Sequence, residues 1–502
     1  MNRIDNDLLS VQEARILVEN AREAQKTLAA FPQQKLDNIV GHMANEACRY
    51  AREFAIMSYE ETGFGKWQDK FIKNIFASDF LYKKIRNMKV VGIIDEDKDN
   101  KTMDIGVPVG VIAALLPSTN PVSTTIYKIM IAIKSGNAIV FSPHPRAKKT
   151  TGKVIDSLIR TAEANGLPSG AIGYLRTMAA SGTVELMNHK DTALILATGV
   201  PKLLKAAYAS GKPVIYGGPG NGPAFIERSA DIRQAVADII TSKTFDNGIV
   251  SASEQSIVVE ECIADQVRQE LRRMGAYFLS GEEADQLGKL FLRPDGSMNP
   301  EIVGKSAVEL AWKIDIRLPE NTKVLISEQK YVSDTNPYSR EKLCPVLAFY
   351  VEKDWIFACE KCIELLVNEG RGHTLVIHSK NEKVIREFAL KKPVSRVLVN
   401  TPAALGGIGV TTNLFPALTL GCGAAGGSFT SDNVSPINLI NIRKVGYGVR
   451  KLEDITTTEQ AIVSAKSSGS CILPKQLSPE STRDLQAVLE KLLEQLAQGT
   501  KP

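Results

Sequence analysis

Apolar and polar residues follow two different periods along the chain. Over about the first 90 residues, apolar positions recur at helical spacing, which predicts a helical segment. Ser10 and Glu13 have the spacing of a capping box and predict the start of a long helix that ends at Pro32. From residue 109 onward, short apolar runs alternate with helical patterns, which is typical of β-α-β units.

The β-α-β pattern occurs in two series. The first contains the strand-like runs VGVIAALLP, AIVFSP, IGYL, TALILAT and PVIYGG, and the second contains SIVVEE, KVLISE, VLAFYVE, TLVIHS and RVLVN. The turn FDNG at residues 245–248 lies near the junction. We therefore expect an α/β protein with two doubly wound domains, residues 1–242 and 243–432. Ligands should bind at the carboxyl ends of the strands, in the crevice between the domains.

The end of the sequence has a different pattern. Residues 451–480 are rich in Ser, Thr, Gly and Pro and are interpreted as a linker. In residues 481–502, Ser481 and Asp484 predict a helix cap, and one face of the helix carries Leu485, Val488, Leu489, Leu492 and Leu496. Such a helix must bury its apolar face, either on its own body or an oligomer neighbour, or on a partner protein. The long linker favours the partner.

Composition excludes several classes of function. The chain has 502 residues and a net charge of +5, with its 61 basic and 56 acidic residues interspersed, so nucleic-acid binding is not expected. Residues 109–116 form the longest apolar run, far short of the roughly 20 residues of a membrane helix, and no secretory signal is evident. Seven scattered cysteines indicate reduced thiols in the cytoplasm. Cys359 and Cys362 form a CxxC without a second pair, so no metal site is predicted.

Seven segments, in order, resemble the CoA-acylating aldehyde dehydrogenases, including the N-terminal half of the aldehyde-alcohol dehydrogenases. They are LLPSTNPVSTTIYKIMIAIKSGNAIVFSPHPRAKKT, GLPSGAIGYL, ILATGVPKLLKAA, VIYGGPGNGPAFIE, FDNGIVSASEQSIVVEE, EKLCPVLAFY and NTPAALGGIGVTTNLFPALTLGCGAAGGSFTSDN. The resemblance covers residues 5–450. It implies an aldehyde dehydrogenase-like fold with an oligomerisation arm near residues 97–108 and 433–450, and a homo-oligomer. It also implies a small aliphatic aldehyde such as acetaldehyde or propionaldehyde as substrate.

The nucleophile loop carries the main departure from this family. In the segment FDNGIVSASEQS, Ser251 stands where the family has a cysteine. The resemblance assigns two donors to the tetrahedral oxyanion, the side chain of Asn120 and the backbone N–H of Ser251. Asn120 could instead be a helix cap beside Pro121. Because a serine hydroxyl is hardly ionised near neutral pH, we expect feeble turnover at most. Either a substituted cysteine or a native non-catalytic scaffold protein would account for the serine.

The resemblance also bears on the acyl acceptor. Hydrolytic relatives carry a glutamate that activates water just before the Gly-Gly of the VIYGG segment, where this chain has Ile215 and Tyr216. Neither residue can act as a general base near neutral pH, which favours transfer to CoA over hydrolysis. A hydrolytic aldehyde dehydrogenase remains the alternative. Glu341 matches the family glutamate that binds the nicotinamide ribose, and an exposed loop carboxylate is its other interpretation.

Cofactor residues follow from the same resemblance, which implies NAD and CoA. The turn of Gly199 and Val200 should lie beneath the pyrophosphate. The remaining residues assigned to cofactor binding are Ser142, Pro143, His144, Pro145, Gly217 and Gly218. Finally, the tail resembles the short helices that direct aldehyde dehydrogenases into bacterial microcompartments. We therefore expect residues 481–502 to bind shell proteins and the protein to lie inside a microcompartment in the cytoplasm.

Overall fold

The computed structural model describes residues 5–452 and residue 454. The chain divides into a large unit, Met1–Asp95 with Asp104–Lys444, and a small unit made of Glu96–Met103 and residues from Val445 onward. The large unit contains both predicted α/β domains and the whole candidate site. Most of the predicted linker and all of the predicted tail helix, residues 481–502, lie outside the described residues.

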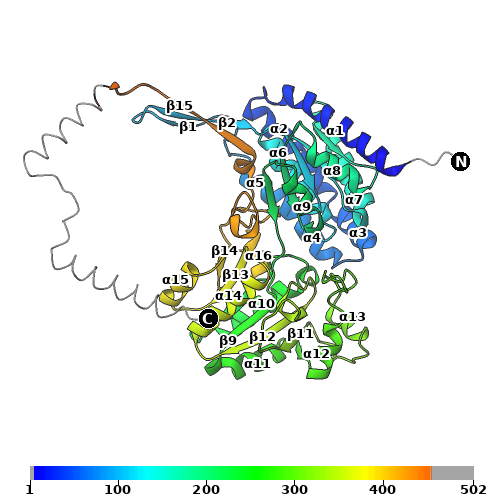
Figure 1. Cartoon of the computed structure of the whole chain (residues 1–502), viewed down its shortest axis with the longest axis vertical. Helices are drawn as coiled ribbons and strands as arrows, with labels where there is room; N and C mark the ends of the chain where they lie inside the picture. The colour runs from blue at the N-terminus through cyan, green and yellow to red at the C-terminus, as the bar shows by residue number, and fades with distance from the viewer. Residues whose placement is uncertain (1–4, 453, 455–502) are drawn as a thin grey trace, which may run out of the picture. The chain divides into compact units, whose positions relative to one another are not determined.

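The N-terminal segment is helical, as its periodicity predicted (Figure 1). Its helices are α1 (Asn6–Leu28), α2 (Gln33–Arg49), α3 (Ala51–Thr62), α4 (Trp67–Ile75), the π-helical η1 (Phe76–Phe80) and α5 (Leu81–Ile85). The predicted start at Ser10 is wrong, because the carboxylate of Asp5 caps α1 by accepting from the N–H groups of Asp7 and Leu8. Ser10 lies inside the helix and donates to the carbonyl of Thr177.

The first sheet has five parallel strands in the order β5-β4-β3-β6-β7. They are β3 (Val111–Leu115), β4 (Ala138–Ser142), β5 (Ile172–Tyr174), β6 (Thr192–Thr198) and β7 (Val214–Gly217). The connecting helices are α6 (Pro121–Lys134), α7 (Lys148–Ala164), α8 (Ala180–Asn188) and α9 (Pro201–Ala209). The winding direction reverses between β3 and β6, which is the position where such sheets bind ligands.

Both faces of this sheet are covered by helices (Figure 1). Along β3, Val111, Ala113 and Leu115 pack into a core shared with α1, α8 and α9. The alternate residues Ile112 and Ala114 pack into the opposite core with α2, α6 and α7. Because successive strand side chains face opposite layers, a strand that is apolar throughout is what a sheet buried on both sides requires.

The second sheet has seven parallel strands in the order β10-β11-β12-β9-β8-β13-β14. They are β8 (Pro223–Ile226), β9 (Ser256–Glu260), β10 (Ala276–Phe278), β11 (Val324–Glu328), β12 (Val346–Glu352), β13 (Gly372–His378) and β14 (Val394–Val399). Its helices are α10 (Ile232–Thr244), α11 (Ala264–Arg273), α12 (Gly281–Gly288), α13 (Ala307–Trp312), α14 (Trp355–Asn368), α15 (Glu382–Leu390) and α16 (Ala403–Gly407). The prediction of two doubly wound sheets is confirmed.

The boundary between the two sheets differs from the predicted one at residue 242. β8 lies on the N-terminal side of that boundary, yet it pairs with β9 and β13 of the second sheet. The chain therefore passes from one sheet to the other between β7 and β8, and α10 follows the crossing. The sequence pattern missed β8 because only four residues form this strand, directly after a Gly-rich turn.

A separate three-stranded sheet has the order β1-β2-β15, with β1 (Gly92–Asp97), β2 (Thr102–Pro108) and β15 (Ile440–Gly446). The two segments predicted to form the arm contribute β2 and β15 to it. Ile93 and Ile442 are exposed apolar residues of this sheet. Within the described residues, no helix is long and apolar enough to cross a membrane, and no three potential metal ligands come together.

Candidate active site

Two neighbouring cavities lie beyond the carboxyl ends of the strands of the first sheet. The first is lined by the predicted residues Asn120, Gly199, Gly217, Gly218, Ser251 and Glu341. The second is lined by the predicted residues Ser142, Pro143, His144, Pro145 and Val200. Gly199 and Val200 are adjacent in the chain, so the two cavities lie on either side of one turn. The structure therefore brings every residue predicted for the site to one of two adjoining cavities.

The strand ends explain this convergence. Asn120 follows β3, Gly199 follows β6, and Gly217 ends β7, so these residues share one edge of the parallel sheet. Gly199 has a φ of +63°, a left-handed conformation that lets the chain turn directly into α9. Ser251 reaches the same cavity from the second sheet, in the loop that precedes β9.

The side chain of Asn120 is oriented by its contacts. Asn120 is the N-cap residue of α6, but its side chain makes no capping hydrogen bond, so the helix-cap interpretation does not account for it. Its Oδ1 accepts a hydrogen bond from the ammonium group of Lys73, and its Nδ2 has only a long 3.4 Å contact with the hydroxyl of Thr119. The amide nitrogen is thus left as a donor at the cavity.

Ser251 offers a second donor. Within the described residues, its backbone N–H donates no hydrogen bond and its hydroxyl has no hydrogen-bond partner. The hydroxyl therefore lacks the neighbouring base that activates a serine nucleophile. The exposed Cys262, beyond β9, does not line either cavity. Asn120 and Ser251 thus line the same cavity with N–H groups free to donate, but the cavity has no activated nucleophile.

The loop at Ser251 packs tightly against the crossing between the sheets. A Cβ atom on Gly220 would lie 1.7 Å from the carbonyl oxygen of Ser251 and 3.2 Å from Cε1 of His373. Only glycine permits that approach. The N–H of Gly220 donates to Oε1 of Glu341 over 2.7 Å, so this residue contacts both the nucleophile loop and a wall of the cavity.

The carboxyl group of Glu341 has a raised pKa. Burial, reinforced by the nearby carboxylate of Glu369, raises the pKa of Glu341 to about 8. The N–H of Gly220 and the ammonium groups of Lys243 and Lys342 act in the opposite direction. Glu341 lines the first cavity, which disagrees with its interpretation as an exposed loop carboxylate.

The two residues before Gly217 provide no base. Ile215 is fully buried, and burial raises the pKa of the Tyr216 phenol far above its usual range, with the charge of Glu341 next in effect. Tyr216 nevertheless lines the first cavity. A neutral phenol that stays protonated cannot remove a proton from water.

His373 is buried behind the loop of Ser251 and lines neither cavity. Both ring nitrogens are buried and have no hydrogen-bond partner within the described residues. Desolvation, followed by the charge of Arg396, lowers the pKa of His373 to about 3, so the imidazole is neutral. Its position beside Gly220 arises because β13 pairs with β8, a long-range contact that no local sequence signal reveals.

The second cavity is less polar. The hydroxyls of Ser142 and Thr183 hydrogen-bond each other over 2.7 Å. Nδ1 of His144 accepts from the N–H of Arg146 over 3.1 Å and caps the short helix that begins at Pro145. The second ring nitrogen of His144 makes no such contact within the described residues. Prolines and small side chains leave a slot suited to a flat, weakly polar group.

Comparison with known proteins identifies relatives of this chain. The aldehyde dehydrogenase family matches residues 7–291. The bifunctional aldehyde-alcohol dehydrogenase of Escherichia coli (strain K12) is 42% identical over 441 residues, which cover 87% of this chain and 49% of that protein. The chain thus spans about half the length of the aldehyde-alcohol dehydrogenases that it matches.

Two solved structures have the same fold over most of the chain. An acetylating aldehyde dehydrogenase from Geobacillus thermoglucosidasius has a TM-score of 0.87 and 46% identity, covering 90% of this chain and 99% of its own. A propionaldehyde dehydrogenase from a Clostridium phytofermentans microcompartment has a TM-score of 0.79 and 27% identity, covering 88% and 98%. The expected aldehyde dehydrogenase-like fold is confirmed.

Other structures in this group contain ligands. A propionaldehyde dehydrogenase of Rhodopseudomonas palustris holds CoA and an acylated cysteine; it is 25% identical, with a TM-score of 0.78 and coverage of 86% and 97%. An engineered glycolyl-CoA reductase holds NADP+; it is 26% identical, with a TM-score of 0.78 and coverage of 86% and 96%.

Replacement of Gly220 tests the packing at the crossing. We expect Gly220→Ala to lower the free energy of unfolding by about 1–3 kcal/mol, because the added methyl group collides with the carbonyl of Ser251. Denaturant titration measures the effect. Gly281→Ala is the control, since a Cβ there meets no atom within 4 Å. Equal stability of the two variants would contradict the close approach.

A pH series tests the environment of Glu341. Its carboxyl has a raised pKa in the folded state, so folding takes up a proton between about pH 4.3, its unfolded value, and about pH 8. Its contribution to stability is therefore complete at low pH and is lost as the pH rises through about 8. Glu341→Gln should lose less unfolding free energy than the parent between about pH 5 and 9. If the unfolding free energies of Glu341→Gln and the parent changed in parallel over this pH range, the pKa of Glu341 would not be raised by folding.

Proposed function

The chain belongs to the aldehyde dehydrogenase family, and from this premise we propose that its site is built to convert a short aliphatic aldehyde, CoA and NAD into an acyl-CoA and NADH. The observation that carries the proposal is the pair of N–H donors, Asn120 Nδ2 and the Ser251 backbone, at one cavity where Ile215 and Tyr216 provide no base before Gly217. Acetaldehyde and propionaldehyde are the expected substrates.

The chain's own residues account for the first step. An aldehyde whose oxygen accepts from Asn120 and from the N–H of Ser251 has its carbonyl carbon beside the side chain of residue 251. With a cysteine there, attack by the thiolate forms a tetrahedral thiohemiacetal, and both donors stabilise its oxyanion. Loss of hydride leaves a thioester on residue 251, and attack by a second thiol releases the acyl group.

The two cavities fit the cofactors. Gly199, Gly217 and Gly218 line the first cavity with backbone, and the N-terminal end of α9, which carries a partial positive charge, suits a pyrophosphate. The slot lined by Ser142, Pro143, His144 and Pro145 suits an adenosine. When bound, NAD accepts the hydride and CoA accepts the acyl group. Because one adenosine slot adjoins the reaction cavity, NAD and CoA are proposed to use it in turn.

Protection of the thioester from water favours CoA as the acceptor. Ile215 and Tyr216 occupy the positions before Gly217, and neither can generate hydroxide near neutral pH. His373 lies beside the loop of Ser251 but lines neither cavity, and a pKa of about 3 makes it too weak a base to activate water there. The lack of a base at these three residues supports transfer between sulfur atoms instead of hydrolysis.

With serine at position 251, this chain is expected to bind the cofactors but to turn over only feebly. Its hydroxyl has no hydrogen-bonded base within the described residues, so it stays protonated near neutral pH. A non-catalytic scaffold protein is the rival from another functional class, and a hydrolytic dehydrogenase is the rival among the enzymes.

Two further proposals concern partners. The exposed apolar residues Ile93 and Ile442 on the three-stranded sheet support a homo-oligomer in which this sheet is covered by another subunit. Residues 481–502 are proposed to bind shell proteins of a bacterial microcompartment. Their amphipathic sequence and the microcompartment origin of one structural relative support this.

Introduction of a thiol at residue 251 tests the proposed reaction. Ser251→Cys should produce NADH only when aldehyde and CoA are both present, and the parent chain should be slower by orders of magnitude because it lacks a thiolate. Absorbance of NADH at fixed aldehyde and NAD, with and without CoA, measures this.

The other possible results of this assay would favour one of the two rival functions or reject the site. NADH formation that does not need CoA would favour the hydrolytic enzyme. Calorimetric binding of NAD and CoA without turnover in Ser251→Cys would favour the scaffold protein. If Ser251→Cys neither bound NAD and CoA nor turned over, the assignment of these residues to an active site would be rejected.

Removal of residues 455–502 tests the tail. The shortened chain should lose co-purification with co-expressed shell proteins while its melting temperature stays unchanged, because the tail is proposed to act only through its partner. In the full chain, Leu489→Glu on the apolar face should have the same effect, and Ala487→Glu on the opposite face should not. Unchanged co-purification of the shortened chain would reject the proposal.

A further inference from the structure

A cluster of three buried charges lies beneath the first cavity. Lys70 and Lys73 extend from α4, and both contact the carboxylate of Asp246 in the nucleophile loop. Lys70 is 3% exposed, Lys73 is 1% exposed and Asp246 is fully buried. Buried charges are costly to desolvate, so three of them at one point call for an explanation beyond general stability.

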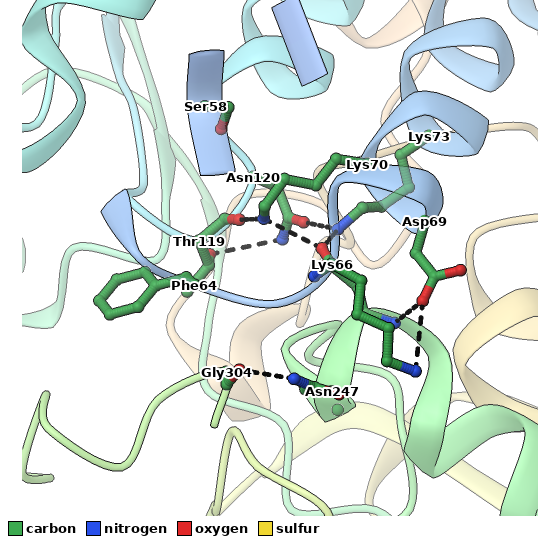
Figure 2. Close-up of polar contacts among 12 residues, drawn as sticks. Ser58, Phe64, Lys66, Asp69, Lys70, Lys73, Thr119, Asn120, Asn247 and Gly304 are labelled. Carbon is green, nitrogen blue, oxygen red and sulfur yellow. Dashed lines mark hydrogen bonds and ion pairs between the residues drawn. The ribbon is translucent and has the colours of Figure 1, made fainter. Parts of the chain in front are cut away.

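The two lysines share Asp246 but differ in their other partner (Figure 2). The ammonium of Lys70 donates to the backbone carbonyl of Thr119 and to Asp246, both over 3.1 Å. The ammonium of Lys73 donates to Asp246 and to Oδ1 of the Asn120 side chain. Lys73 thus links the nucleophile loop directly to the amide that faces the cavity.

Asp246 is held in a specific conformation. Asp246, Asn247 and Gly248 have φ values of +48°, +53° and +74°, three consecutive left-handed residues that begin the turn towards Ser251. The N–H of Lys66 donates to Oδ1 of Asp246 over 2.6 Å, and the N–H of Asp246 donates to Asp69 over 2.7 Å.

The neighbouring chain accommodates this turn. A Cβ on Gly65 would lie 1.9 Å from Oδ1 of Asp246, so only glycine fits there. The side chain of Asn247 donates to the carbonyl of Gly304 (Figure 2). The N–H of Gly65 donates to the same carbonyl. Both the carboxylate and the turn are therefore fixed from several directions.

We propose that Lys73, held by Asp246, is a positioning residue that fixes the Asn120 amide with its oxygen away from the cavity and its N–H₂ group towards the reacting oxygen. The inference rests on the proposed function. An asparagine amide has two faces of opposite polarity, and the reversed orientation would present Oδ1 to the oxyanion and repel it. An ammonium group has donors only, so contact with Lys73 selects the orientation in which Oδ1 is its partner.

The net charge of Lys70, Lys73 and Asp246 also strengthens the N–H donor of Asn120. One carboxylate and two ammonium groups sum to a single positive charge, and Lys73 is a lining residue of the cavity. A cation on Oδ1 polarises the amide and strengthens its N–H donor. A purely structural cluster would need neither the contact with Asn120 nor a position at the cavity wall.

A double-mutant cycle separates positioning from structure, with Ser251→Cys as the active background. We expect Lys73→Met to lower kcat by about 10²-fold and Asn120→Ala by about 10²–10³-fold. Because Lys73 acts through Asn120, the double variant should be no slower than Asn120→Ala alone. The KM for NAD should change by less than about twofold. Multiplied losses in the double variant would overturn the proposal.

Lys70→Met is the matched control. It removes the same charge from the same helix and the same carboxylate, but not the contact with Asn120. Its loss of kcat should be smaller and should multiply with that of Asn120→Ala. Lys134→Met removes a buried lysine that pairs with Asp37 far from the site and should leave kcat unchanged. Equal, non-multiplying losses for Lys70 and Lys73 variants would contradict a role specific to Lys73.

A measurement without turnover keeps this inference distinct from the proposed reaction. Neutron diffraction of the unmodified chain locates deuterium on the amide of Asn120. Oδ1 at the Lys73 ammonium and two deuterons on the cavity side are expected, whereas the reversed amide would overturn the inference. If Ser251→Cys gave no turnover, the proposed reaction would fail, and the neutron result would still decide the orientation.

Discussion

The buried carboxylate of Asp246 holds together the two parts of the site. It belongs to the loop that carries Ser251 into the second sheet, and its partners lie on α4 beside the first sheet. Through Lys73 it contacts Asn120, and through Lys70 it contacts the backbone before Asn120. The two proposed oxyanion donors come from different domains, so their mutual geometry depends on this contact. Without Asp246, two buried ammonium groups would lose their counter-charge.

The chemistry of the cavity follows from what surrounds these donors. Close approach at Gly220 brings the loop of Ser251 against the crossing between the sheets, and it leaves a neutral His373 behind that loop. The wall before Gly217 is apolar or phenolic, so it provides no base that would hydrolyse the proposed acyl intermediate. The turn of Gly199 and Val200 lines both this cavity and the second one. Together these features support the proposed acyl transfer to a thiol, in which a cysteine at position 251 would be the point of attachment.

Individual elements show how much of the fold and of the site the sequence predicts. Alternating apolar runs predicted both sheets, because burial on two faces leaves a clear pattern in β3 and its neighbours. The short strand β8 left no such pattern, which is why the change from one sheet to the other falls before the expected boundary at residue 242. The start at Ser10 was wrong because Asp5, one turn earlier, is an equally good cap. For the site, motif resemblance located Asn120, Ser251 and Glu341. The contacts of Lys70, Lys73 and His373 come from residues distant in sequence, and no local period encodes them.

The central claim is that one cavity positions an aldehyde between Asn120 and the backbone of residue 251. Because turnover with serine at position 251 is expected to be feeble at most, the chain can be crystallised with NAD and a short aldehyde. The account predicts the aldehyde oxygen within hydrogen-bond distance of Asn120 Nδ2 and of the Ser251 N–H, with the nicotinamide in the same cavity. An aldehyde oxygen turned away from both donors, or a dinucleotide bound elsewhere, would contradict it.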